Sequence, residues 1–529
     1  MQDTVVVGAG FSGLYLIHKL RNLGFNVRAF EAADDVGGTW YWNQYPGARC
    51  DVESLEYSYS FSDDLQQDWQ WSERYATQPE ILAYAKHVAD RFELRDAISF
   101  RTRVVGAEFN AAEGMWTIRT DRGEILRARY FIMAGGNLSM PRMPEFPGRD
   151  GFKGRLYHTG SWPHEPVDFS GLRVAVIGTG SSGVQVIPKI AEQAARVTVF
   201  QRTANYCSPA RNLTLPQDKV EWYKRNYGAR RERARYSGAG VAAHPVPLYS
   251  ALQVPVEKRQ EAFEAAWTRG GAGILRCFND ILTNPESNEL LSEFVRNKIR
   301  EIVKDPEVAA RLTPTDHGIG TKRICVDSNY YATFNRDNVE LVDLRQDPIV
   351  TIIEQGIRTE SKSFDFDAIV FATGYDAVTG AMRQIDISGP GDKRLAESWA
   401  EGPRGYLGLL TSGFPNLFMI SGPGTPAAVS NAIAAIEQQV EWIADCMLYM
   451  RERGYTQIDA TPEAEAMWTD HVRDVANTTL MPRANSWYMG ANVPGKPRVF
   501  LAYLGGLGAY RMRCADVAFM GYDGFKLTP

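Results

Sequence analysis

Two copies of one glycine-rich turn dominate the sequence. Each copy follows a short apolar run and precedes a stretch with helical spacing, and the copies lie 170 positions apart (178 minus 8). In a GxGxxG turn the first glycine allows a tight bend, the second lets the backbone approach a pyrophosphate, and the third lets helix and strand pack closely. The glycines are Gly8, Gly10 and Gly13 in the first copy and Gly178, Gly180 and Gly183 in the second. The chain is therefore predicted to be an α/β protein with two Rossmann-like dinucleotide-binding domains.

The residue that ends the second strand of each unit differs between the copies. In the first unit it is Glu31, whose carboxylate can accept hydrogen bonds from ribose hydroxyls. In the second unit it is Gln201, which is followed by Arg202 and Thr203. A carboxylate repels a 2′-phosphate, whereas a guanidinium can bind it through two hydrogen bonds. The first unit is therefore predicted to bind FAD and the second to bind NADPH.

Composition excludes several classes of function. The chain has 529 residues, enough for two or three domains, and its net charge is −5 without a long basic run. Nucleic acid and anionic membrane surfaces are therefore not expected as partners. The charge-rich stretch 224–235 is predicted to be a solvated helix face.

The six cysteines are scattered and form neither a CxxC pair nor a zinc-type cluster. This favours a reducing compartment and argues against a bound metal or a dithiol redox centre. The first residues lack the basic region of a signal peptide, and no run of about eighteen apolar residues occurs. We therefore expect a cytoplasmic protein without a transmembrane helix.

Local signals predict further elements between the two glycine turns. Residues 77–92 are predicted to form a helix that opens at Thr77, with Glu80 three residues later as in a capping box. Residues 98–134 alternate between apolar and polar types, as strands do, with a hairpin turn at 121–123.

Two longer patterns lie beside the glycine turns. FKGRLYHTGSWP, residues 152–163, holds five residues at fixed spacings, and VGGTWYWNQYPGARCD, residues 36–51, holds a second set. A lone histidine in such a stretch is most simply a buried, hydrogen-bonded side chain in a linker, but five matched positions in twelve argue against that interpretation. The five are Phe152, Gly154, His158, Trp162 and Pro163. Together the two patterns resemble the signatures of type I Baeyer–Villiger monooxygenases, and the resemblance covers nearly the whole chain.

This resemblance implies a reaction and a domain order. Such enzymes use FAD, NADPH and O2 to insert oxygen beside a ketone carbonyl, through a C4a-peroxyflavin and a Criegee intermediate, and they release esters or lactones. The resemblance also implies an FAD domain that is split around the NADPH domain. We expect the first FAD part at residues 1–139, the NADPH domain at 140–371 with a helical insertion at about 216–312, and the second FAD part at 372–529.

Site residues follow from the resemblance by position. Arg323, in a Thr-Lys-Arg triplet, matches the catalytic arginine of the family, and Asp51 matches the acid that pairs with it. Contacts with FAD are implied at Gly8, Gly10, Ser12, Gly13, Glu31, Thr39, Trp40, Tyr41, Trp42, Asp51, Tyr57, Val104 and Ala432. Contacts with NADP are implied at Arg49, Cys50, Asp51, Thr179, Gly180, Ser181, Ser182, Gly183, Val184, Gln185, Arg202, Thr203, Lys322, Arg323 and Trp487.

A guanidinium suits the role implied for Arg323. It stays charged, so it can stabilise both a flavin peroxide anion and the oxyanion that forms when the peroxide adds to a ketone. A lysine could lose its proton on desolvation, and Asp51 would orient the arginine. Bound NADP+ would act as a lid that excludes water. We hypothesise that His158 and Trp162 serve the accompanying domain motion rather than the chemistry.

Three other functions would use parts of the same sequence. A flavin monooxygenase that oxidises sulfides or amines shares the cofactors, but its signature ends without Trp–Pro and gives Arg323 and Asp51 no clear purpose. An NADPH-dependent disulfide reductase would need the CxxC pair that is missing here. A non-catalytic flavin-binding sensor would keep both glycine turns but would not need Arg323.

The sequence identifies neither the preferred ketone nor the oligomeric state, and a monomer is compatible with it. Residues 425–436 are dense in alanine, with Ala432 where related sequences often carry a bulkier residue. We therefore expect a roomy pocket that accepts aryl or cyclic ketones.

Overall fold

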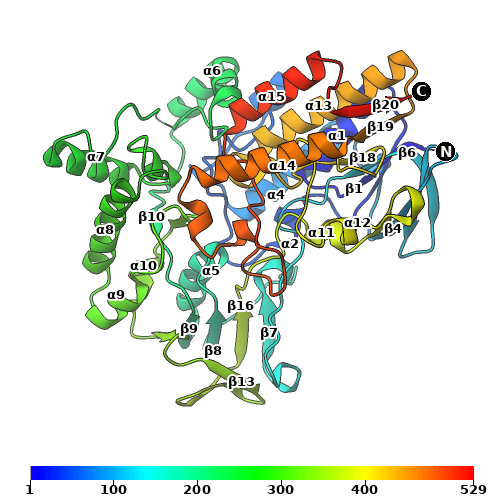
Figure 1. Cartoon of the computed structure of the whole chain (residues 1–529). Helices are drawn as coiled ribbons and strands as arrows, with labels where there is room; N and C mark the ends of the chain where they lie inside the picture. Colours follow the sequence, from blue (N-terminus) through cyan, green and yellow to red (C-terminus); the bar gives the residue numbers. More distant parts are fainter. Residues whose placement is uncertain (1, 245) are drawn as a thin grey trace.

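A mixed sheet of eight strands carries the first glycine turn (Figure 1). The structure is a computed structural model, and it describes residues 2–244 and 246–529. Strand β1 pairs in parallel with β2 and β6, and helix α1 (Phe11–Asn22) makes the crossover that parallel strands require. The strands in order are β17 (Asp386–Ser388), β4 (Val104–Asn110), β5 (Met115–Thr120), β6 (Ile125–Met133), β1 (Gln2–Val7), β2 (Val27–Phe30) and β3 (Ile98–Ser99), and β18 (Leu417–Met419) pairs with β6.

A second sheet of five parallel strands carries the second glycine turn and lies in the lower part of Figure 1. Helix α5 (Ser181–Ala191) connects β8 to β9, as α1 connects β1 to β2. The central strands are buried along nearly their whole length, as expected for a parallel sheet covered on both faces. The strands in order are β12 (Val339–Asp343), β9 (Arg196–Gln201), β8 (Arg173–Ile177), β16 (Ala368–Phe371) and β7 (Arg155–His158). The predicted pair of Rossmann-like units is confirmed.

Further helices and short sheets surround these two units. Helix α13 packs against α1, and α15 packs against α6 and α13 at the top of Figure 1. The helices are α2 (Thr39–Trp42), α3 (Asp63–Asp68), α4 (Gln78–Arg91), α10 (Tyr330–Thr333), α11 (Gly380–Arg383), α12 (Leu395–Ser398), α13 (Ala432–Arg453), α14 (Pro462–Asn477) and α15 (Leu507–Phe519). The short strands are β10 (Cys207–Pro209), β11 (Cys325–Asp327), β13 (Ile349–Ile353), β14 (Gly356–Thr359), β15 (Ser363–Asp365), β19 (Gln457–Ala460) and β20 (Phe525–Thr528).

The helical segment that follows the second turn divides between two hydrophobic cores. Val220, Tyr223 and Tyr227 of its first helix lie in the core of the first unit. Apolar residues of the next two helices lie in the core of the second unit. The helices are α6 (Gln217–Tyr236), α7 (Val256–Arg269), α8 (Pro285–Ile302) and α9 (Pro306–Leu312). Helix α6 therefore packs against the first unit, although it follows the second unit in the chain.

This packing makes one sequence prediction wrong in part. Residues 224–235 were expected to form a solvated face, but Arg231 is only 8% exposed and its guanidinium lies over the ring of Tyr227. Arg230 beside it is also largely covered, with a side-chain exposure of 17%. A charged side chain can be buried when the fold provides a carboxylate or carbonyl partner for it, so a run of charges alone does not establish solvent exposure.

Local predictions around α4 are mostly confirmed. Thr77 is the N-cap residue, but its side chain makes no capping hydrogen bond. The carboxylate of Glu80 instead accepts hydrogen bonds from the backbone N–H of Ser72 at 2.7 Å and from its hydroxyl at 2.9 Å. The capping box is therefore wrong, although the helix is present. The turn at 121–123 joins two antiparallel strands, as predicted.

Across residues 2–244 and 246–529, the helices lack a stretch that is both long enough and apolar enough to span a bilayer.

The third glycine of each turn is required by close approach of the backbone. A Cβ on Gly13 would lie 1.9 Å from the carbonyl oxygen of Gly8, and one on Gly183 would lie 2.2 Å from that of Gly178. Each helix therefore packs directly on the turn that precedes it, which places its N-terminus over the site of a bound pyrophosphate.

We expect Gly13→Ala to lower the free energy of unfolding by about 3 kcal/mol, because the helix must move away from the turn. Purified Gly13→Ala protein should also carry much less flavin, measured by absorbance after denaturation. Gly228→Ala is the control, because Gly228 is exposed in α6 and an added Cβ meets nothing within 4 Å. That variant should be about 0.5–1 kcal/mol more stable. A Gly13→Ala protein with normal stability and flavin content would contradict this account.

Candidate active site

Arg323 and Asp51 form an ion pair where the two units meet. Asp51 follows the Pro-Gly turn of the first unit, and Arg323 precedes β11 beside the second. Nη2 of Arg323 donates to Oδ2 of Asp51 at 2.6 Å, and Nε donates to the same oxygen at 3.0 Å. Nη1 lies 3.5 Å from the carbonyl oxygen of Ala428. The pair predicted from the sequence is therefore in contact across 272 positions of the chain.

The electrostatics of this pair keep the guanidinium charged. The carboxylate of Asp51 is the main cause of a raised pKa for Arg323, and it outweighs the opposing effect of burial. The side chains are 30% exposed for Arg323 and 23% exposed for Asp51. A small molecule can therefore reach a fixed positive charge that does not depend on pH in the working range.

Sequence reasoning missed Tyr488, which lies beside this pair. Its side chain is 2% exposed and is a further cause of the raised pKa of Arg323. Its ring centroid is 4.1 Å from that of Trp487. Within residues 484–498, Trp487 is the one position for which the resemblance implies a contact with NADP. The stretch is anchored nearby, because the side-chain amide of Asn492 donates to the carbonyl of Tyr375 at 2.7 Å. The one sequence signal for a role of Tyr488 was its position next to Trp487.

The helix N-termini at the two glycine turns are open. Gly10 is the N-cap of α1 and Gly180 is the N-cap of α5, and within the described chain neither helix has a capping side chain or an acid in its first turn. A Cβ added at Gly180 would meet nothing within 4 Å. The backbone N–H groups of both first turns, with those of Ser12 and Ser182, can therefore face a phosphate. Both turns fit the pyrophosphate of a dinucleotide.

Glu31 lies at the end of β2, as predicted, and is 6% exposed. One carboxylate oxygen accepts from the N–H of Ala9 at 2.7 Å and the other from the N–H of Ala33 at 2.9 Å. Burial raises the pKa of Glu31. Each oxygen keeps a second lone pair that a ribose hydroxyl can use, so the carboxylate fits the role predicted for it. The carbonyl of Glu31 accepts from Thr102, which brings Val104 of β4 close by.

The other residues predicted to contact FAD lie in two groups. Thr39, Trp40, Tyr41 and Trp42 form helix α2, directly after the glycine turn at 37–38. The indole N–H of Trp40 donates to the hydroxyl of Tyr57 at 3.1 Å, which links this helix to the second group. Ala432 begins α13, and its neighbour Asn431 donates to the carbonyl of Glu56 at 2.8 Å, next to Tyr57.

Residues predicted to bind NADP meet at the contact between the two units. The hydroxyl of Tyr45 donates to the side-chain carbonyl of Gln185 at 2.7 Å, and the amide of Gln185 donates to the carbonyl of Arg49 at 3.0 Å. A Cβ on Gly47 would lie 2.5 Å from the carbonyl oxygen of Gln185, so the turn before Cys50 packs directly on α5. The predicted residues of the two units are therefore brought together.

A cluster of cations lies at the end of β9. Arg202 follows this strand and is exposed, and the hydroxyl of Thr179 donates to the carbonyl of Thr203 at 2.9 Å. Burial is the main cause of a lowered pKa for Lys322, and the positive charge of Arg202 adds to the effect. Arg142 is affected in the same way by burial and by Arg202. Sequence reasoning missed Arg142, which lies in the segment between β6 and β7.

Known proteins place the chain in a family. Residues 2–219 match the flavin-binding monooxygenase-like family. A Baeyer–Villiger monooxygenase of Pseudooceanicola batsensis is 45% identical over 528 residues, which cover 98% of this chain and 95% of that protein. A phenazine N-monooxygenase of Lysobacter antibioticus is 42% identical over 536 residues, which cover 99% of this chain and 97% of that protein. An oxidised steroid monooxygenase solved with NADP has a TM-score of 0.95 at 52% identity, with 100% of this chain and 99% of that chain covered.

The chain belongs to the Baeyer–Villiger monooxygenases. The resemblance seen in the sequence is confirmed, and so is the α/β fold. The protein is an FAD- and NADPH-dependent flavoprotein monooxygenase, and the two open glycine turns described above accommodate these cofactors.

In this Baeyer–Villiger monooxygenase the signature histidine joins the two chain crossings between the sheets. His158 is 2% exposed, and its Nδ1 accepts from the N–H of Gly160 at 2.9 Å. The proton therefore lies on Nε2, which is 3.2 Å from both the carbonyl of Arg142 and the hydroxyl of Thr373. Burial lowers the pKa of His158, so the ring is neutral. These two contacts lie on the crossings that lead from β6 to β7 and from β16 to β17.

The other signature residues surround edge strand β7. Phe152 is 9% exposed, and a Cβ on Gly154 would lie 2.5 Å from its ring, so the glycine makes room for the phenyl group. Trp162 is 4% exposed, and its backbone N–H donates to the carbonyl of Trp42 in α2 at 3.3 Å. Pro163 follows directly. The signature therefore touches both units and both crossings, which supports a role in their relative motion.

We expect His158→Ala to fold and to keep its flavin but to form ester about tenfold more slowly, because the loss of hydrogen bonds worth about 1 kcal/mol each loosens both crossings. Thermal unfolding, flavin content and the rate of ester formation test this. His158→Asn is the matched control, since its amide can donate to the same carbonyl, and it should be closer to the wild type. A near-normal rate for the alanine variant would contradict the hypothesis.

Proposed function

We propose that this monooxygenase converts ketones to esters or lactones with Arg323 as its catalytic arginine and Asp51 as the residue that positions it. The main support is the pair of hydrogen bonds, at 2.6 and 3.0 Å, from Nη2 and Nε of Arg323 to one carboxylate oxygen. Asp51 thus holds one edge of the guanidinium and leaves the Nη1 end for other contacts. Ketone and O2 are the other reactants.

The bound cofactors supply hydride from NADPH and an activated oxygen on reduced FAD. Arg323 supplies a fixed positive charge, which stabilises the negative charge that develops on the reacting oxygens. Asp51 keeps this guanidinium charged and oriented, so little reorganisation is needed as the reaction proceeds. The buried side chain of Tyr488 lies beside Arg323 and packs against the ring of Trp487, so one side of the pair is lined by aromatic residues.

We infer that the predicted cofactor contacts are used as follows. Lys322, Arg202 and Thr203 hold the 2′-phosphate of NADPH, and the first turn of α5 holds its pyrophosphate through residues Thr179, Gly180, Ser181, Ser182, Gly183, Val184 and Gln185. Arg49, Cys50 and Trp487 complete this site. FAD is held by Gly8, Gly10, Ser12, Gly13, Glu31, Thr39, Trp40, Tyr41, Trp42, Asp51, Tyr57, Val104 and Ala432. The open helix N-termini and the cationic cluster at β9 support these roles.

We infer an FAD domain of residues 1–139 and 372–529 and an NADPH domain of residues 140–371. Within the insertion at 216–312, helix α6 packs in the core of the FAD domain, which supports grouping it with that domain in space.

For the ketone, we infer a pocket beside Arg323 that accepts aryl or cyclic compounds. The carbonyl of Ala428 approaches the guanidinium at 3.5 Å, and the small side chains of the surrounding segment, which also holds Ala427 and Ala432, support this inference. Oxidation of an amine or a sulfide is the second candidate, and the 42% identity to a phenazine N-monooxygenase favours its inclusion. We also infer a cytoplasmic setting, because all six cysteines are free and five of them are buried.

Arg323→Ala should lower ester formation by about 10²–10³-fold, because one preorganised cationic donor is lost where negative charge develops. NADPH oxidation without product should persist. The measurement is ester formed per NADPH consumed, with flavin content as a check on folding. Arg336→Ala, at an arginine that the structure leaves outside the site, is the control and should behave as the wild type. Ester formation at undiminished speed in Arg323→Ala would refute the proposal.

The substrate class is tested on the wild-type enzyme with a panel of ketones, amines and sulfides. We expect esters or lactones from aryl and cyclic ketones. N-oxides or S-oxides without any ester would favour the second candidate, and reaction of short linear ketones alone would rule out a roomy pocket.

Alkaline pH should weaken the binding of NADPH. The pKa of Lys322 is lowered by burial, so Lys322 loses its charge at a lower pH than an ordinary lysine does, and the grip on the 2′-phosphate fails as pH rises through that value. The KM for NADPH should rise by up to about tenfold for each pH unit beyond that point. Lys322→Arg should remove the dependence, and the KM for NADH, which lacks the phosphate, should not show it. A flat profile for NADPH in the wild type would contradict the assignment of Lys322.

A further inference from the structure

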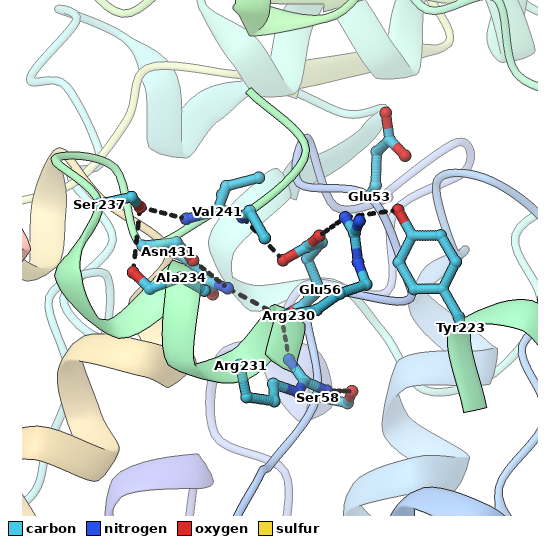
Figure 2. A network of polar contacts seen from close by, with 12 residues as sticks. Glu53, Glu56, Ser58, Tyr223, Arg230, Arg231, Ala234, Ser237, Val241 and Asn431 are labelled. Carbon is cyan, nitrogen blue, oxygen red and sulfur yellow. Dashed lines mark hydrogen bonds and ion pairs between the residues drawn. The ribbon is translucent and has the colours of Figure 1, made fainter. Parts of the chain in front are cut away.

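A buried polar network joins helix α6 to the FAD domain (Figure 2). Glu56 is 2% exposed, and its Oε1 accepts a hydrogen bond from Nη2 of Arg230 at 2.5 Å. The guanidinium of Arg230 also donates to the hydroxyl of Tyr223 at 2.9 Å and lies over its ring. Arg231, 8% exposed, donates to the carbonyl of Glu56 at 3.0 Å and to the hydroxyl of Ser58 at 2.6 Å. These are the arginines that the sequence placed on a solvated face.

Glu56 also holds the chain that follows α6. Its second carboxylate oxygen accepts from the backbone N–H of Ala242 at 3.1 Å. The hydroxyl of Ser237 accepts from the N–H of Val241 at 3.0 Å and donates to the carbonyl of Ala234, also at 3.0 Å, which shapes the turn between α6 and Ala242 (Figure 2). One carboxylate therefore fixes both the helix and its C-terminal turn.

Asn431 connects this assembly to the start of α13. Its side-chain amide donates to the carbonyl of Glu56 at 2.8 Å and to that of Gly240 at 3.2 Å. Its side-chain oxygen accepts from the N–H of Ile433 at 3.2 Å, which caps the helix. Its own backbone N–H donates to the carbonyl of Ala239 at 2.8 Å. Asn431 is 2% exposed, so all these bonds lie away from water.

The loop that ends at Asn431 reaches the proposed catalytic arginine. Residues 425–431 precede α13, and the carbonyl of Ala428 in this loop lies 3.5 Å from Nη1 of Arg323. Because only two residues separate Ala428 from Asn431, the place of the loop beside Arg323 depends on how Asn431 is held. The start of the segment is held separately, because Ala427 is buried with Ala435 and Leu507 and the backbone N–H of Tyr503 donates to the carbonyl of Thr425 at 3.0 Å, so Asn431 holds its C-terminal end.

We propose that Asn431, Glu56, Arg230 and Arg231 are positioning residues that hold the loop 425–431 against Arg323 and so set the size of ketone that the enzyme accepts. The inference rests on the proposed function and names a determinant of its substrate class. The network contacts neither glycine turn. Glu56 and Asn431 adjoin Tyr57 and Ala432, which are assigned to FAD, so flavin content is measured in each variant. In variants that keep FAD fully bound, we expect a change in the fit of the ketone and not in the reduction of FAD by NADPH.

Asn431→Asp separates this role from simple helix capping. An aspartate keeps the oxygen that caps α13 but cannot donate to the carbonyls of Glu56 and Gly240. With Asn431→Asp and Asn431→Ala we expect the KM for a bulky aryl or cyclic ketone to rise on the order of tenfold, and less ester to form per NADPH consumed. Anaerobic reduction of the flavin by NADPH should stay within twofold of the wild type. Amide hydrogen exchange in residues 425–431 should become faster.

Glu56→Gln and Arg230→Lys test the rest of the network. Glutamine keeps the acceptor for Ala242 but loses the charge that compensates Arg230, so it should raise the ketone KM as the Asn431 variants do. Arg230→Lys keeps the positive charge beside Glu56, so it should raise the ketone KM less than Glu56→Gln does. Val220→Ala is the control for destabilisation alone, because Val220 is buried in α6 and belongs to the apolar core. It should lower the thermal midpoint without a change in ketone KM or in exchange at 425–431.

The outcomes are distinct. If Asn431→Asp matches the wild type in ketone KM and in hydrogen exchange of the loop, the positioning role is refuted. If Val220→Ala raises the KM as much as Asn431→Asp does, stability and not positioning is responsible, and the proposal also fails. If the wild type forms no ester from any ketone, the proposed function fails, while the hydrogen-exchange comparison still decides whether the network holds the loop.

Discussion

The contact between Arg323 and Asp51 links the two halves of this enzyme at the point where they must cooperate. The carboxylate follows the Pro-Gly turn of the first dinucleotide unit, and the guanidinium comes from the segment that precedes β11 beside the second. The negative charge of Asp51 is the main cause of the raised pKa of Arg323. The units also meet through hydrogen bonds, such as that of Tyr45 with Gln185, and through the burial of Tyr45 and Ala48 in the hydrophobic core of the second unit.

Two separate sets of hydrogen bonds surround the Arg323–Asp51 pair. Hydrogen bonds of His158 join the two segments that connect the sheets, which agrees with the hypothesis that the signature sequence serves domain motion. On the other side, Asn431 and Glu56 hold the loop whose carbonyl approaches Arg323. We propose that the first set of contacts governs how the halves move and that the second governs which ketone fits between them.

Much of this arrangement could be predicted from the sequence. Both Rossmann-like units, the end of β2 at Glu31 and the contact of Arg323 with Asp51 were predicted and are present. The capping box at Thr77 was wrong because Glu80 found a partner outside its helix in Ser72. The buried position of Tyr488 was not predicted, since a single aromatic residue in a loop carries no periodic signal.

By itself the sequence determined the turns and the choice of cofactors, because these depend on residue types at short, regular spacings, whereas the charged pair was assigned through the resemblance to the family. Only the tertiary structure decided that Arg231 is buried, that α6 packs with the FAD domain, and that Asn431 joins three distant segments. Whether a charge is solvated depends on which carboxylates and carbonyls the fold brings to it. Glu56 lies 174 positions from Arg230, and no local pattern encodes such a contact.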